Sequence, residues 1–255
     1  AAEQLGIELV FATDRCQQLD DPWRDRAIGV RFHEEERSVE AIVAAARHAP
    51  FQGVLAVGDR PAVLAARVAA RLGLPGHTPD AAAASGNKLE TRRRLAAAEL
   101  AVPSYFTLPA GGDGTRAAAD ARIDFPCVLK PLGLSGSRGV IRADSRQEFA
   151  SAFARISALL ARVDVRAART GLENIILVER FIPGREFAVE GVLTAGTLQV
   201  LAIFDKPDPL DGPFFEETIY VTPTALDAAS QRHLAATIQQ ASDAIGLRHG
   251  PVHAE

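Results

Sequence analysis

The sequence predicts an α/β protein in two parts: a Rossmann-like first part and an α+β second part. Strand and helix patterns alternate over the first eighty residues, which is typical of parallel βαβ units. Beyond that point, strand patterns follow one another with few helices between them. The chain has 255 residues, of which 47% are hydrophobic, so it is long enough to bury a large core.

The first part is expected to span residues 1–78. Its helices are predicted at residues 39–48, with Ser38 as N-cap, and at residues 59–72, with Pro61 in the first turn and Gly73 after the last. Three strands are predicted at residues 7–12, 27–32 and 53–57. The Pro- and Gly-rich residues 74–79 mark the boundary.

The second part is expected to span residues 79–255. It begins with a helical stretch at 80–100, interrupted near Ser85 and Gly86, and later has a long helix at 145–163 with Ser145 as cap. A flexible loop is predicted at 110–114 and a last helix at 225–245. The extended segments are predicted at residues 104–108, 125–130, 140–143, 174–179, 186–193 and 198–204.

Composition excludes several classes of protein. Lys and Arg number 28 against 32 Asp and Glu, a net charge of −4, which argues against a broad nucleic-acid-binding surface. No apolar run approaches the roughly 20 residues that cross a bilayer, so no membrane partner is expected. Cys16 and Cys127 are far apart and lack a CxxC partner, which favours a reducing, cytoplasmic location and a core role for Cys127.

Both ends of the chain suggest a fragment of a longer protein. There is no methionine, residues 1–6 read as the end of a helix, and residues 250–255 stop in extended sequence. Naturally frayed termini are the alternative.

The first chemical signal is a glycine-rich loop at residues 133–139 that follows Lys130. Three glycines in seven residues let backbone N–H groups approach an anion, and a lysine at the end of an apolar strand suits phosphate oxygens. The loop lacks the Gly-Lys-Ser/Thr of a Walker A motif and the spacing of a dinucleotide fingerprint. A flexible hairpin loop with a solvated lysine is the alternative.

The second signal is a pair of acids around a turn. Glu179 and Glu186 flank an extended stretch that contains Pro183 and Gly184. The exposed backbone of such a hinge can hydrogen-bond adenine, and a carboxylate beyond the turn can accept from ribose hydroxyls. A surface hairpin with two solvated acids is the alternative.

Together these features resemble the ATP-grasp superfamily, and most closely its carboxylate–amine ligase branch, which includes amino-acid ligases. The segments that carry the resemblance are LGLPG, NKLETRRRLAAAELAVPSY, FPCVLKPLGLSGSRGV and ILVERFIPGREFAVEG. It covers nearly the whole chain and is strongest over residues 73–192. It implies a pre-ATP-grasp Rossmann-like domain followed by an ATP-grasp fold.

The resemblance also implies roles for individual residues. Lys88 and Lys130 would hold the α- and β-phosphates, and Ser135, Gly136, Ser137 and Gly139 would close over the β- and γ-phosphates. Glu179, Arg180, Phe181 and Ile182 would read adenine, and Glu186 would hold the ribose. Lys130, Arg138 and Lys206 would act in catalysis, and Glu255 would be one of two acidic Mg²⁺ ligands.

The reaction implied is ATP-dependent joining of a small-molecule carboxylate to an amine through an acyl phosphate, with ATP and Mg²⁺ required. The first strand and the second metal-ligand strand of the family have no counterpart in these residues, so the fragment alone is expected to be inactive. A homodimer is left open.

Other functions are also compatible with the sequence. They are another ATP-grasp enzyme (a carboxylase or purine-pathway ligase), an inactive ATP-binding module, and a dinucleotide oxidoreductase. Among single residues, Lys206 could instead be a solvated loop lysine, and Glu190 could form a structural salt bridge rather than line the cleft. His253 is a weak candidate for substrate contact, residues 92–94 are expected to be a solvated helix face, and residues 212–217 a lid or core segment.

Overall fold

The protein, described here by a computed structural model, divides into two compact units, Ala1–Ala83 and Ala84–Glu255. The structure describes residues 2–14, 27–120, 124–167, 171–216 and 218–255, so Cys16 lies outside the described residues. The domain limits of 1–78 and 79–255 stay a prediction. None of the described helices is both long and apolar enough to cross a membrane.

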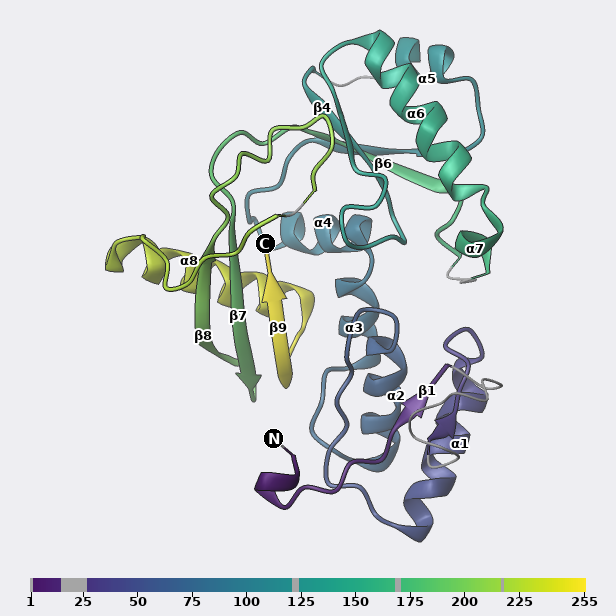
Figure 1. Cartoon of the computed structure of the whole chain (residues 1–255), viewed down its shortest axis with the longest axis vertical. Helices are drawn as coiled ribbons and strands as arrows, with labels where there is room; N and C mark the ends of the chain where they lie inside the picture. The colour runs from purple at the N-terminus through teal and green to yellow at the C-terminus, as the bar shows by residue number, and fades with distance from the viewer. Residues whose placement is uncertain (1, 15–26, 121–123, 168–170, 217) are drawn as a thin grey trace. The chain divides into compact units, whose positions relative to one another are not determined.

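The first unit packs two helices against a short parallel ladder (Figure 1). After a 3₁₀ turn at Glu3–Leu5, strands β1 (Ala12–Thr13) and β2 (Ile28–Gly29) pair in parallel, which confirms the predicted direction. Helices α1 (Glu35–His48) and α2 (Ala62–Leu72) bury a cluster against them that includes Val30, Val39, Ile42, Leu64 and Val68.

All three strand predictions in this unit differ from the structure: of the expected strand at 27–32, only Ile28–Gly29 forms one. Residues 7–11 and 53–57 form no strand, and Leu55 and Val57 are exposed. Period-two hydrophobicity produces a strand only where a neighbour supplies a run of backbone partners. The Phe11 carbonyl accepts from the Ile28 N–H at 2.8 Å, but the paired ladder begins only at Ala12.

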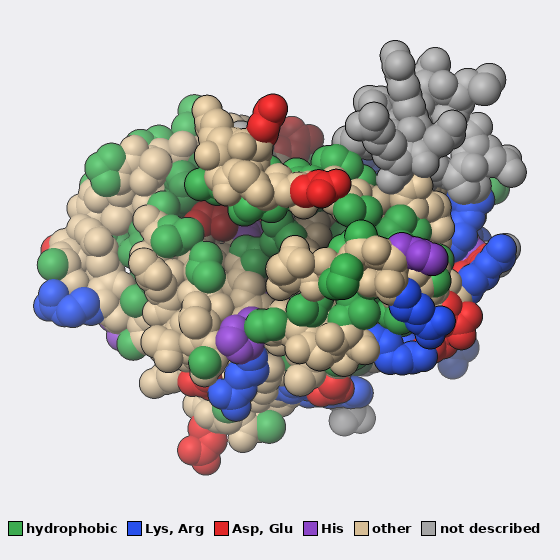
Figure 2. Space-filling view, turned by 90° about the horizontal axis from the view of Figure 1, so that it is seen from below, with side chains coloured by type: hydrophobic (Ala, Val, Ile, Leu, Met, Phe, Trp, Pro, Cys, Tyr) green, Lys and Arg blue, Asp and Glu red, His purple; other side chains and the backbone are tan. Residues whose placement is uncertain are grey.

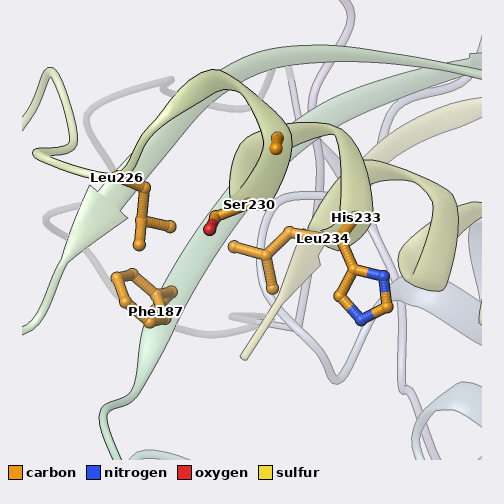
Figure 3. A pocket seen from close by; sticks show the side chains of 6 residues that line it. Phe187, Leu226, Ser230, His233 and Leu234 are labelled. Atoms are coloured by element: carbon orange, nitrogen blue, oxygen red, sulfur yellow. The ribbon is translucent and has the colours of Figure 1, made fainter.

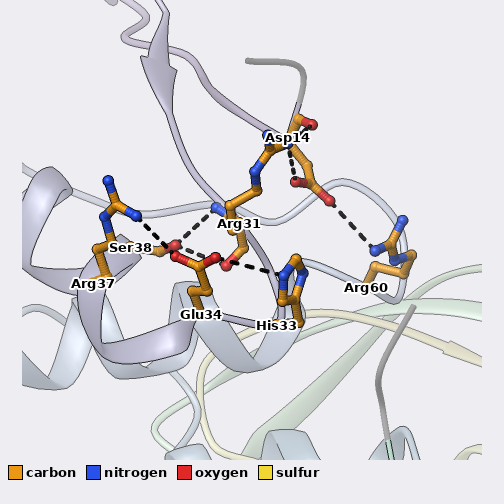
Figure 4. A network of polar contacts seen from close by, with 7 residues as sticks. All are labelled: Asp14, Arg31, His33, Glu34, Arg37, Ser38 and Arg60. Carbon is orange, nitrogen blue, oxygen red and sulfur yellow. Dashed lines mark hydrogen bonds and ion pairs between the residues drawn. The ribbon is translucent and has the colours of Figure 1, made fainter. Parts of the chain in front are cut away.

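The predicted helix cap at Ser38 was also wrong. Helix α1 begins at Glu35, where two acidic residues favour its N-terminus, and Ser38 lies buried in its first turn. The Ser38 hydroxyl accepts from the Arg31 N–H at 2.9 Å and donates to the Arg31 carbonyl at 2.8 Å. Ser38 therefore ties the β2–α1 connection to the helix, within a network that Asp14 extends to Arg31 and Arg60 (Figure 4).

The second unit contains two antiparallel sheets, in keeping with the predicted α+β class. The first has the order β3-β6-β4-β5, formed by Tyr105–Pro109, Ile175–Arg180, Cys127–Pro131 and Ile141–Ala143. The second has the order β8-β7-β9, formed by Thr197–Asp205, Phe187–Thr194 and Gly250–Ala254. Helix α3 (Pro79–Ser85) spans the boundary between the two units. The helices within the second unit are α4 (Lys88–Ala97), α5 (Gly114–Asp120), α6 (Arg146–Leu160), α7 (Val163–Arg166) and α8 (Ala228–Ile245).

Helix α6 covers one face of the first sheet and forms the main core. Its Phe149, Phe153 and Ile156 pack against Cys127 and Leu129 of β4, together with Ile176 and Val178 of β6. Ser145 caps the helix by accepting from the Glu148 N–H at 3.3 Å, which confirms the predicted cap. The alternate residues of β4 and β6 point to the opposite face, where α4 lies (Figure 1).

The exposed hydrophobic residues do not gather into one broad patch on the face shown in Figure 2. There, hydrophobic side chains are interspersed with charged and polar ones. Single exposed apolar residues of this kind are ordinary on folded proteins.

Candidate functional site

Of the two predicted phosphate-binding lysines, Lys88 contacts the glycine-rich loop directly and Lys130 lies in the strand before it. Lys88 is the first residue of α4, whose N-cap Asn87 accepts from the backbone N–H groups of Leu89 and Glu90. Its Nζ donates to the carbonyl of Leu134 at 2.5 Å and to that of Leu132 at 3.5 Å. Lys130 is the penultimate residue of β4, so two cations from separate elements belong to segments that border the loop 132–139.

The glycine-rich loop takes several left-handed backbone angles. Gly136 (φ +61°), Ser137 (φ +53°) and Gly139 (φ +81°) all lie in this region. A Cβ at Gly139 would come within 2.8 Å of Leu159 Cδ2 and 2.9 Å of Pro131 Cγ, whereas one at Gly136 would meet open space. Gly139 is therefore required by packing as well as by its backbone angle, while Gly136 leaves room beside the backbone.

Arg138 points away from the lysines, toward α7. Its Nη2 lies 3.0 Å from Asp164 Oδ2, and both side chains are exposed. Hydrogen bonds from Arg162 and then Arg138 lower the pKa of Asp164 to about 2. A catalytic role for Arg138 therefore requires release from Asp164.

Glu179 lies at the centre of an ion cluster on the α4 side of the sheet. Its carboxylate is almost completely buried, with Lys130 Nζ at 2.6 Å and Arg92 Nε at 2.6 Å. A second guanidinium nitrogen of Arg92, Nη2, lies 3.4 Å from it. Burial works to raise the pKa of Glu179, but the charges of Lys130 and Arg92 lower it overall, so the carboxylate stays ionised.

The backbone after Glu179 is partly committed to the sheet. The Arg180 N–H donates to the Ser104 carbonyl and the Phe181 N–H to the Pro126 carbonyl, both at 3.0 Å. Ile182 follows with 66% of its surface exposed. Adenine recognition by Arg180 would therefore use its carbonyl oxygen, and recognition by Ile182 its exposed backbone.

A second ion cluster surrounds Lys206. This side chain is 4% exposed, and its Nζ lies 2.5 Å from Glu186 Oε1 and 2.8 Å from Glu255 Oε1. The Tyr220 hydroxyl donates to the same Glu255 oxygen at 2.7 Å. The solvated-loop alternative for Lys206 was wrong, because the two carboxylates offset the cost of burying the ammonium.

The pKa values of this cluster follow from those contacts. Burial works to lower the pKa of Lys206, but its hydrogen bonds to Glu186 and Glu255 raise it overall. Burial likewise works to raise the pKa of Glu255, but the hydrogen bonds from Lys206 and Tyr220 lower it overall. The ammonium and the Glu255 carboxylate are therefore both charged at neutral pH.

The remaining candidate residues make contacts with other side chains of the protein. Glu190 Oε1 lies 2.8 Å from His253 Nδ1, which is the structural salt bridge alternative, and His253 Nε2 lies 3.8 Å from Glu255. Cys127 is fully buried in the main core, as predicted. In the segment 212–217, Phe214 stacks with Arg155 and Phe215 lies beside Phe181, while Glu217 is outside the described residues.

The prediction of a solvated face at residues 92–94 was wrong for two of the three arginines. Arg92 pairs with Glu179, and Arg94 donates to Glu90 and to the Ile245 carbonyl. Only Arg93 is mainly exposed. The sequence did contain one indication of this: Arg92 follows Lys88 by four residues, which places both side chains on one helix face.

The metal prediction rests on Glu255. Among the residues that the structure describes, no three His, Cys, Asp or Glu side chains lie close enough to hold a metal ion together. Mg²⁺ is often bound by one or two carboxylates together with substrate phosphates, so a single carboxylate is a chemically suitable part of such a site.

A separate hollow of about 410 Å³ lies beside β7 and the start of α8 (Figure 3). Phe187, Leu226 and Leu234 line it, with Ser230 and His233 at its edge. It contains none of the predicted nucleotide-binding residues.

Comparison with known proteins finds amino-acid ligases among the relatives of this chain. An alanine–anticapsin ligase of Bacillus amyloliquefaciens is 27% identical over 150 residues, covering 54% of this chain and 31% of that protein. A D-alanine–D-alanine ligase of Aromatoleum aromaticum is 29% identical, covering 66% of this chain and 50% of that protein. The chain thus spans a third to a half of these curated relatives.

A solved structure resembles the chain over almost its whole length. The L-amino acid ligase from Bacillus licheniformis superposes with a TM-score of 0.81 at 27% identity, covering 99% of this chain and 59% of that one. The model of the ATP-grasp N-terminal domain matches residues 1–76, and that of the ATP-grasp domain matches residues 123–255, slightly more than half of the chain. The chain belongs to the ATP-grasp family.

Proposed function

We propose that this chain binds ATP in an enzyme that joins a carboxylate to an amine through an acyl phosphate. The observation that carries the proposal is that Lys88 binds carbonyls of the glycine-rich loop while Lys130 lies in the strand that leads into it. Two cations beside a loop with left-handed backbone angles suit a polyphosphate. ATP-grasp ligases use ATP, which is consistent with this chemistry.

Each part of the nucleotide has a proposed binding group. Lys88 and Lys130 hold the α- and β-phosphates, and the backbone of Ser135, Gly136, Ser137 and Gly139 covers the β- and γ-phosphates. Arg180 and Ile182 contact adenine through their backbone atoms, and Phe181 and Glu179 lie next to the base. Glu186 accepts from the ribose hydroxyls, with Lys206 neutralising its excess charge.

Glu255 is the proposed metal ligand of this chain. Its carboxylate oxygen is the donor type that Mg²⁺ prefers, and its pKa is lowered, so it is ionised when the metal binds. When bound, Mg²⁺ neutralises phosphate charge. Lys206 now holds Glu255 in place and would balance its charge in the absence of a cation.

The reaction needs positioning and charge neutralisation more than covalent help from the protein. A carboxylate oxygen of the substrate attacks the γ-phosphorus, the bond from that phosphorus to the β-phosphate oxygen breaks, and ADP leaves. The amine nitrogen then attacks the acyl carbon, phosphate leaves, and the nitrogen loses a proton. Lys130 and a released Arg138 neutralise the negative charge on the transferring phosphoryl group, and Lys206 would contribute once its two carboxylates engage the ribose and Mg²⁺.

The relatives favour the ligase over the other readings. Their names describe ligases of amino acids, so the carboxylate and the amine are proposed to be amino acids or similar small molecules. The glycine loop lacks the dinucleotide fingerprint, which disfavours an oxidoreductase. A homodimer stays a prediction that light scattering would test.

The decisive experiment is trapping of the acyl phosphate. The enzyme that carries this chain is incubated with ATP, Mg²⁺, hydroxylamine and a panel of amino acids and other carboxylates. We expect a hydroxamate together with equal amounts of ADP and phosphate for at least one carboxylate. No hydroxamate and no phosphate release, with tighter binding of NADH than of ADP in calorimetry, would overturn the proposal.

A further inference from the structure

The ion cluster of Arg92, Glu179 and Lys130 contains one acid and two bases. Lys130 and Glu179 project from the same face of adjacent strands: Val128 pairs with Glu179, and Lys130 is two residues farther along β4. Arg92 reaches the same carboxylate from α4, 87 residues away in sequence. Three separate elements thus meet at one buried charge.

The net charge of this cluster determines whether Lys130 can attract an anion. A buried carboxylate beside a single lysine would form a neutral pair, and that lysine would present little net charge to an anion. With Arg92 also bound to Glu179, the cluster carries one net positive charge. Because Lys130 and Arg92 are each 24% exposed while Glu179 is 3% exposed at its side chain, the positive groups face the surface and the negative group does not.

We propose that Arg92 is a positioning residue that balances the charge of Glu179, so that the ammonium of Lys130 remains available to the phosphates of the nucleotide. This inference rests on the proposed function. Arg92 is suited to the task because its guanidinium remains charged at every physiological pH and contacts the carboxylate through two nitrogens.

The neighbouring arginines do not share this role. Arg93 is 62% exposed, and its guanidinium lies 3.8 Å from Glu90. Arg94 is directed to Glu90 and to the end of α8. Arg93 therefore offers a control with the same loss of charge, on the same helix, one residue away.

The test compares ADP with adenosine, which lacks phosphates. Calorimetry measures both affinities for the unchanged protein and for Arg92→Gln, Arg93→Gln and the double variant Arg92→Gln/Glu179→Gln. We expect Arg92→Gln to weaken ADP binding by about 10- to 30-fold, the effect of one unit charge over roughly 8–12 Å at an effective dielectric constant near 20. Adenosine affinity should change by less than about threefold, and Arg93→Gln should resemble the unchanged protein.

The double variant separates charge from structure. It removes one positive and one negative charge, so the cluster again carries one positive charge, on Lys130. Because Glu179 is also proposed to lie at the adenine, the measure is the preference for ADP over adenosine, which should recover most of the loss. This variant also contains no buried carboxylate that has lost a partner, in case Arg92→Gln folds poorly. Equal weakening of ADP and adenosine by Arg92→Gln, or no recovery in the double variant, would overturn the inference.

The affinities of the unchanged protein show whether a negative result concerns the phosphate site or only the role of Arg92. If it binds ADP no better than adenosine, the proposed phosphate site itself is wrong. If it prefers ADP and Arg92→Gln keeps that preference, the phosphate site stands and the role of Arg92 is wrong.

Discussion

A carboxylate as deeply buried as that of Glu179 is stable only while hydrogen bonds and opposite charges replace the water it has lost. Lys130 and Arg92 supply both, at 2.6 Å each. Glu90, on the same helix as Arg92, pairs with Arg94 at 3.1 Å but is partly solvated. These two acids allow a buried and a solvated ion pair to be compared within one unit.

We expect Glu179→Gln to lower the free energy of unfolding by about 2–4 kcal/mol at pH 7, because two partly buried cations lose their anion. Glu90→Gln should cost less than about 1 kcal/mol, as exposed ion pairs do. Urea denaturation of both variants measures these values. A Glu179→Gln cost no larger than that of Glu90→Gln would contradict the energetic importance of the cluster.

The ion cluster around Glu179 also predicts how the stability of the protein depends on pH. The pKa of Glu179 is lowered by folding, so its contribution is complete above its ordinary value of about 4.3 and is lost as the pH falls below that value. The stability difference between the unchanged protein and Glu179→Gln should therefore be constant from pH 7 to about pH 5 and shrink at lower pH. Urea titrations at several pH values check this, and a difference that grows on acidification would refute it.

Cys127 should be inert in the folded protein. Burial, with a smaller effect from Asp144, raises the pKa of its thiol to about 12, and no part of the side chain reaches the surface. We expect iodoacetamide at pH 8 to leave Cys127 unmodified until urea unfolds the protein, as measured by mass spectrometry of its peptide. Rapid labelling without denaturant would show that the β4 core opens readily.

At the scale of elements, the connection between β4 and β5 combines one packed glycine with one open glycine. Gly139 is enclosed by Pro131 and by Leu159 of α6, whereas Gly136 has free space at the Cβ position. Both have positive φ values, so an alanine is strained at either position. The difference in stability between alanine substitutions at the two sites therefore measures the effect of packing around the added Cβ.

Gly139→Ala should therefore destabilise the protein by about 2–4 kcal/mol, the sum of backbone strain and overpacking. Gly136→Ala should cost only about 1 kcal/mol, from strain alone. Chemical denaturation of the two variants gives the comparison. Equal costs would mean that Leu159 moves aside without penalty.

At the scale of the whole molecule, every residue assigned to nucleotide binding belongs to the second compact unit, Ala84–Glu255. They come from α4, β4, the loop that follows it, β6 and the hinge after it. Binding energy is therefore expected to stabilise this unit first.

We expect ADP to slow amide hydrogen exchange in residues 84–255, most strongly in α4, in the loop 131–139 and around residues 180–186. Exchange in residues 2–76 should change little. At a concentration one hundred times the dissociation constant, ADP should stabilise the second unit by about 2.7 kcal/mol. Exchange measured by mass spectrometry tests the pattern, and protection confined to residues 2–76 would contradict the assignment.

Much of the local structure follows from the sequence alone. Asn87 and Ser145 are caps because their side chains accept from N–H groups that a helix leaves unpaired, and Gly73 ends α2 because its φ of +68° is easy only for glycine. The antiparallel strands of the second unit follow from alternating apolar residues and turns. These features depend on neighbours within a few residues, and the family motifs are local in the same way.

The tertiary structure alone decided which charges meet. Arg92 and Glu179 are 87 residues apart, and Lys206 and Glu255 are 49 apart. The four-residue spacing places Arg92 on the helix face of Lys88, but no local spacing could show that Arg92 meets Glu179 or that Lys206 is buried. Likewise, residues 53–57 have the pattern of a strand but pair with no strand among the residues that the structure describes. A sequence determines which groups a segment presents, whereas the burial and pairing of a charge depend on the segments that the fold brings against it.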